Sequence, residues 1–107
     1  MAVWIAWAGV LVAGDYLSAV EIPLLGEGGS PRAYLATLER LRPLVEAAEH
    51  VVPGHGPVLQ AARALGVLEE DTAYLRALSE NGAAQLPADR RGAVQREHHA
   101  KNLVALG

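Results

Sequence analysis

The sequence predicts a single α/β domain, and three observations support that class. Two short apolar runs, AVWIA and VLVA, open the chain, a helical pattern follows at residues 30–48, and a third apolar run, HVVP, leads into a loop rich in glycine and proline. Further helical segments are expected at residues 58–65, 68–79 and 88–106. We therefore expect residues 1–107 to form one domain, in which residues 1–60 carry the motifs and residues 61–107 supply helices.

The composition excludes several classes of protein. The net charge is -3, and the densest basic run, Arg90 with Arg91, is only a pair, so nothing predicts nucleic-acid binding. There are no cysteines, which rules out disulfides, thiolate zinc sites and cysteine nucleophiles. Any metal ion must be held by nitrogen and oxygen ligands, and the missing thiols fit a cytoplasmic location.

The apolar opening, MAVWIAWAGVLVA, is predicted to be a buried hairpin rather than a signal peptide or membrane anchor. It has no positively charged start, and it is shorter than the about 18 apolar residues that a membrane span needs. Trp7, Ala8 and Gly9 suit the turn. Neither strand alternates cleanly between apolar and polar residues, which predicts that both faces of the sheet are covered.

Capping and breaking residues set the expected helix ends. Ser30 suits an N-cap with Pro31 at the first helical position, and Pro43 is expected to divide that helix in two. Gly66 is expected to end the next helix.

The remaining helices are expected to carry no chemistry. The acidic run at residues 69–71 would lie in a first helical turn, where the helix dipole favours negative charge. The tail helix is expected to pack over the sheet through Val94, Leu103 and Leu106.

Two residues at strand ends are candidate metal ligands. His55 stands in VVPGHGPV, between two glycines that remove steric bulk and two prolines that stiffen the loop. Asp15, in AGDYLS, also follows an apolar strand, and a helix lies between the two motifs. If both strands run parallel, they end at the same edge of the sheet, where ligands bind in open α/β sheets. Each residue also suits a plain turn, with His55 facing water.

Together these motifs resemble the carboxyl-terminal half of the metallo-β-lactamase superfamily. The resemblance rests on AGDYLS and VVPGHGPV with the helix SPRAYLATLERL between them, and it covers about residues 3–60. It implies half of an α/β/β/α sandwich, with a mixed sheet, helices on one side and a helical tail. In that family the aspartate bridges two metal ions and the histidine binds the second, so Asp15 and His55 would have those roles.

The resemblance also implies a cofactor and a reaction. One or two zinc ions, with iron or manganese as alternatives, would activate a water that attacks an ester, thioester, lactam or phosphodiester bond of a small-molecule substrate. The family's HxHxDH motif is absent, and a catalytic zinc needs about three protein ligands. We expect the chain to bind metal weakly alone, and to be incomplete without upstream sequence.

The other polar candidates are weaker. His50 is expected at a strand boundary, and adjacent His98 and His99 point about 100° apart on a helix, so they cannot readily chelate one ion together. Tyr16, Ser18 and Glu21 follow Asp15 and are candidates for a substrate pocket.

The expected partners follow from the half-sandwich, because one half alone leaves the inner face of its sheet exposed to water. The chain would then pair with the missing amino-terminal half or with a second copy of itself, and no membrane partner is expected. The alternative to a hydrolase is a non-catalytic dimerising half-domain, in which Asp15 and His55 persist as turn residues.

Overall fold

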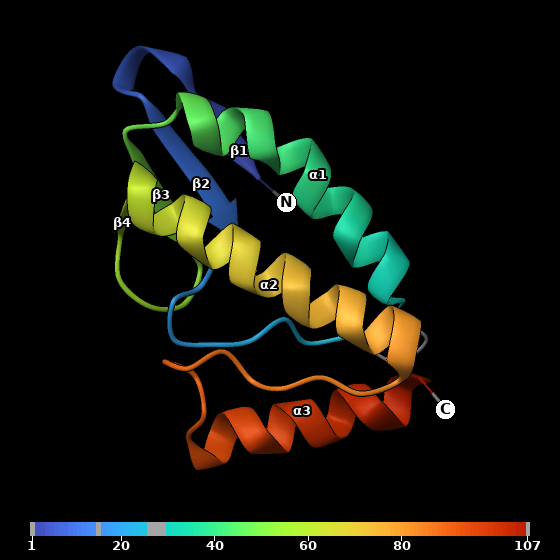
Figure 1. The fold of residues 1–107 in the computed structure, drawn as a ribbon. Coiled ribbons are helices and arrows are strands. Elements are labelled where there is room, and N and C mark those ends of the chain that lie inside the picture. The colour runs from blue at the N-terminus through green and yellow to red at the C-terminus, as the bar shows by residue number, and fades with distance from the viewer. Residues whose placement is uncertain (1, 15, 26–29, 107) are drawn as a thin grey trace.

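The computed structural model describes residues 2–14, 16–25 and 30–106, and it confirms the α/β class (Figure 1). Four strands form one mixed sheet in the order β1-β2-β3-β4. Strand β1 (Val3–Ile5) and strand β2 (Val10–Gly14) form the predicted antiparallel hairpin. A turn of 3-10 helix at Ala6–Ala8 joins them, and Gly9 closes it with a φ of 64° that favours glycine.

Strand β3 (His50–Pro53) lies parallel to β2, as the sequence predicts. The helix between them makes the crossover that a parallel pair requires. Strand β4 (Leu59–Gln60) was not expected, because two residues carry too little pattern to be recognised. It pairs antiparallel with β3 and brings the chain back after the His55 loop.

Helix α1 (Pro31–Ala47) begins where the capping pattern predicts, and Ser30 Oγ accepts a hydrogen bond from the Ala33 N–H at 3.4 Å. The predicted break at Pro43 is wrong, since the helix continues through this residue. Pro43 removes one backbone donor but is exposed, so water can solvate the carbonyl group left without a partner.

Helix α2 (Ala61–Asn81) runs through Gly66, so the two predicted helices at residues 58–65 and 68–79 are one. A glycine inside a helix costs about 1 kcal/mol relative to alanine, which burial of neighbouring apolar residues offsets. Val67 and Leu68 beside it are fully buried. The acidic run therefore lies in the middle of α2 rather than in a first turn.

Helices α1 and α2 pack against each other and cover one face of the sheet, where Leu11, Ala13 and Val51 are fully buried (Figure 1). The prediction that both faces are covered is wrong, because no described residue covers the opposite face to the same extent. We call this surface the open face; by strand register its apolar residues are Val3, Ile5, Val10, Val12 and Val52. Val3 is 47% exposed, and the other four residues are half-buried.

Helix α3 (Ala93–Leu106) does not pack over the sheet, so that prediction is wrong. Val94 is 58% and Leu103 is 39% exposed, and the Leu106 side chain lies outside the described residues. Figure 1 shows α3 beside the irregular segment that follows β2, away from the strands. Among the described residues, no helix combines the length and apolar character needed to cross a bilayer.

Candidate functional site

The ends of β2 and β3 meet, as expected for a site at this edge of the sheet. The Gly54 N–H donates a hydrogen bond to the Gly14 carbonyl oxygen at 2.5 Å. A Cβ atom at residue 54 would lie 2.8 Å from that oxygen, so only glycine permits the approach. The two residues that follow in the chain are Asp15 and His55, and Asp15 lies outside the described residues.

Gly56 has a different requirement. Its φ is 91°, and an added Cβ would lie 2.9 Å from Val20 Cγ2 and 3.3 Å from Ser18 Oγ. The loop around His55 therefore packs against the segment after β2. The two glycines on either side of the histidine are explained by close packing and backbone conformation, rather than by freedom to move.

His55 is exposed and lines a cavity of about 420 Å³. The other lining residues come from the segment after β2 and from α1; they are Tyr16, Glu21, Ile22, Leu24 and Tyr34. One imidazole and one carboxylate thus border a largely aromatic and aliphatic surface. Among the described residues that line it, none is a lysine or arginine.

Two of the three expected pocket residues reach this cavity, namely Tyr16 and Glu21. Ser18 does not: it is buried, and its hydroxyl accepts hydrogen bonds from the backbone N–H groups of Val20 at 3.2 Å and Glu21 at 3.1 Å. Its role is to hold a turn.

Tyr34 is a lining residue that sequence reasoning missed. Its ring meets that of Tyr16 edge to face, with centroids 5.1 Å apart and an interplanar angle of 72°. The only available signal was its place in the first turns of a helix that follows the sequence GEGG.

Leu17, two residues after Asp15, has a φ of 64° although it is not glycine. Such a conformation costs on the order of 1 kcal/mol or more and persists only where the surroundings impose it. The Leu17 side chain is 1% exposed, so its burial holds the backbone in place. Strained residues of this kind concentrate at functional sites.

The remaining histidines lie elsewhere. His50 is exposed at the start of β3, as expected for a boundary residue. His98 and His99 are on α3, and His99 Nδ1 lies 2.7 Å from the Tyr74 hydroxyl. None of the three lines the cavity beside His55.

The described residues do not complete a metal shell. Across residues 2–14, 16–25 and 30–106, no group of three or more histidine, aspartate or glutamate side chains is close enough to hold one ion. The cavity offers the His55 nitrogen and the Glu21 carboxylate, which are suitable donors for zinc but fewer than it requires.

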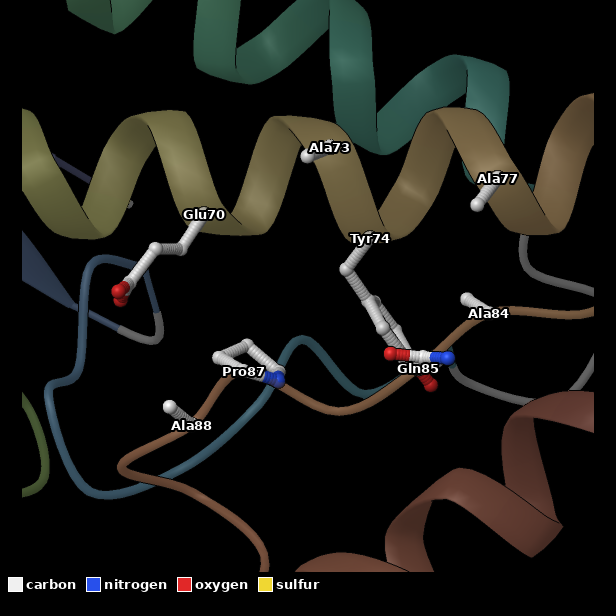
Figure 2. Close-up of a pocket in the computed structure, with 8 residues that line it drawn as sticks. All are labelled: Glu70, Ala73, Tyr74, Ala77, Ala84, Gln85, Pro87 and Ala88. Atoms are coloured by element: carbon white, nitrogen blue, oxygen red, sulfur yellow. The ribbon is translucent and has the colours of Figure 1, made fainter.

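A second hollow of about 310 Å³ lies between α2 and residues 84–88 (Figure 2). Alanines form much of its wall, and Glu70, Tyr74 and Gln85 are its polar lining residues (Figure 2). The Glu70 carboxylate is already engaged, since it lies 3.2 Å from Arg90 and 3.7 Å from Arg63. This hollow therefore presents little reactive chemistry.

Comparison with protein-family models, with curated proteins and with solved structures found no match to this chain.

Proposed function

We propose that the chain is the carboxyl half of a metallo-β-lactamase-like hydrolase, with Asp15 and His55 as metal ligands. The observation that supports this most directly is the pairing of Gly14 with Gly54, because the next residue of each strand is a candidate ligand. His55 also borders a cavity of about 420 Å³ that is large enough for a small molecule.

Zinc bound there would supply a water that loses its proton near neutral pH and could then attack a carbonyl carbon. The chain's own contribution is to hold ligands at the strand ends and to bind the substrate. Tyr16, Ile22 and Leu24 present apolar surface, and the described lining residues include no cationic side chain to pair with a phosphate. We therefore favour esters, thioesters and lactams over phosphodiesters.

The remaining ligands would come from a second polypeptide segment that covers the open face. This face carries aliphatic side chains in a half-exposed state, as a sheet that packs on another sheet would. The partner is either an amino-terminal half or a second copy.

A zinc titration of the purified chain, followed through the His55 imidazole resonances, tests the metal site. We expect weak binding in the unaltered chain and a loss of affinity of at least about tenfold in Asp15→Ala and in His55→Ala, because each removes a ligand. His50→Ala is the control, since this histidine lies at the opposite end of β3. An equal loss in His50→Ala, or unchanged affinity in Asp15→Ala, would contradict the proposal.

The second candidate function is a dimerising half-domain without catalysis, which the open face also favours. Light scattering at micromolar concentration should then give twice the chain mass, 22.6 kDa for two chains of 11.3 kDa. Val12→Asp should give monomers, because it would bury an unpaired charge at the interface. Val104→Asp, at a residue 79% exposed on α3, should leave the dimer intact. A monomeric unaltered chain would exclude self-association.

A further inference from the structure

The segment at residues 18–25 forms a wall of the cavity but belongs to no helix or strand. Three of its residues line the cavity, namely Glu21, Ile22 and Leu24. Ile22 and Leu25 are buried, so their backbone groups have little access to water. A buried irregular segment needs hydrogen-bond partners from elsewhere in the chain. We call residues 18–25 the wall segment.

Those partners are three side chains from the carboxyl-terminal part of the chain, and two of them, Gln95 and Asn102, lie on α3. Gln95 Oε1 accepts from the Ile22 N–H at 2.7 Å. Asn102 Oδ1 accepts from the Leu25 N–H at 2.7 Å, and Asn102 Nδ2 donates to the Pro23 carbonyl at 2.7 Å.

Arg90 holds the beginning of the same segment. Its Nη1 donates to the carbonyl oxygens of Ser18 at 3.2 Å and Glu21 at 2.9 Å. The three partners of the wall segment are buried, with exposed fractions of 1% for Arg90, 8% for Gln95 and 0% for Asn102.

The spacing on α3 matches the spacing along the wall segment. Gln95 and Asn102 are seven residues apart, which places them on one face of the helix, about 10 Å apart along its axis. Ile22 and Leu25 are three residues apart, and three extended residues also span about 10 Å. The helix therefore binds the wall segment through hydrogen bonds at two points with matching spacing. Val94 and Val104 on the same helix remain exposed.

We infer that Arg90, Gln95 and Asn102 are positioning residues of the cavity, which set the place of its wall from the carboxyl-terminal part of the chain. The inference rests on the proposed function only in treating this cavity as the substrate site. It gives the tail helix a role in the site, although none of the three residues lines the cavity. Substitutions on α3 should then change the affinity for substrate, although the substituted residues do not contact the substrate.

The test compares three variants of the full chain by residue-resolved amide hydrogen exchange. Gln95→Met keeps the side-chain length but removes the acceptor, whereas Gln95→Glu restores an acceptor at the same reach. Arg96→Met is the control, because it makes the same change to methionine at the neighbouring, exposed residue of α3 and keeps a similar helix propensity. The Leu68 amide in α2 reports on the fold as a whole, and the rings of Tyr16, Tyr34 and His55 report on the cavity.

In Gln95→Met we expect exchange at Ile22 to become about tenfold faster relative to Leu68, with shifted ring resonances in the cavity. Gln95→Glu should return both to the values of the unaltered chain, and Arg96→Met should change neither. Unchanged exchange at Ile22 in Gln95→Met, or an equal rise in Arg96→Met, overturns the inference.

The unaltered chain provides a check that does not depend on any variant folding. The Ile22 and Leu25 amides should be as protected as amides within α3, because they open only when the helix leaves. Rapid exchange at both would overturn the inference. Zinc is absent from these measurements, so a failed zinc titration would remove the proposed function and leave this result standing.

Discussion

Replacing Arg90 by methionine is expected to lower the free energy of unfolding by about 3–5 kcal/mol at pH 8. Arg90 and Asp71 are each 1% exposed, and Arg90 Nη1 lies 2.6 Å from Asp71 Oδ1. The substitution leaves a buried carboxylate without its cation. It also removes the donor for two carbonyl groups of the wall segment. Urea denaturation followed by circular dichroism measures the change.

Two further variants separate the causes. Arg91→Met changes the neighbouring exposed arginine and should alter the free energy of unfolding by no more than about 0.5 kcal/mol. Arg90→Met combined with Asp71→Asn should recover part of the loss, because the stranded charge is gone. The interpretation fails if Arg90→Met and Arg91→Met cost the same, or if the double variant is less stable than Arg90→Met alone.

The second large effect is a dependence of stability on pH that arises from Asp71. Burial raises the pKa of Asp71 from 3.8 to about 7, against the attraction of Arg90, while Glu70 adds to the rise. Between these two values the folded chain binds a proton that the unfolded chain has lost. The free energy of unfolding therefore falls as the pH rises through this range, at no more than about 1.4 kcal/mol per pH unit.

Asp71→Asn isolates this contribution, because asparagine is neutral at every pH. The unaltered chain and Asp71→Asn should have similar stabilities near pH 4, and the variant should be the more stable by up to about 4 kcal/mol at pH 8. Urea unfolding from pH 4 to pH 8 gives the difference. If the unaltered chain instead gains stability relative to Asp71→Asn as the pH rises, attraction to Arg90 outweighs burial and the pKa is lowered.

Arg90 shows the limit of reading charge from sequence. As half of an Arg-Arg pair it has the pattern of a solvated surface, and residues 69–71 have the pattern of a first helical turn. Neither pattern reveals that Arg90 and Asp71 meet inside the fold, 19 residues apart in sequence. The burial of such a pair depends on how α2 packs with the segment before α3, where the helix predicted from residue 88 does not form until Ala93.

The candidate site could likewise be predicted only in part. The sequence singled out His55, because two glycines and two prolines surround one imidazole within eight residues. The cavity beside His55 could not be predicted, because its walls come from three separate parts of the chain. Tyr34 was missed for that reason, as were the residues of α3 that hold the wall segment.

Local sequence patterns were enough to predict the hairpin, the N-cap of α1 and the parallel pairing of β2 with β3, and they single out the candidate ligands at the strand ends. Each depends on neighbouring residues or on the two periods, 2 and 3.6, that strands and helices impose. The folded chain alone shows that α2 continues through Gly66, that one sheet face stays open, and that α3 holds the wall segment through hydrogen bonds instead of covering the sheet. These outcomes depend on which surfaces meet, because burial free energy outweighs local propensity once distant segments pack together.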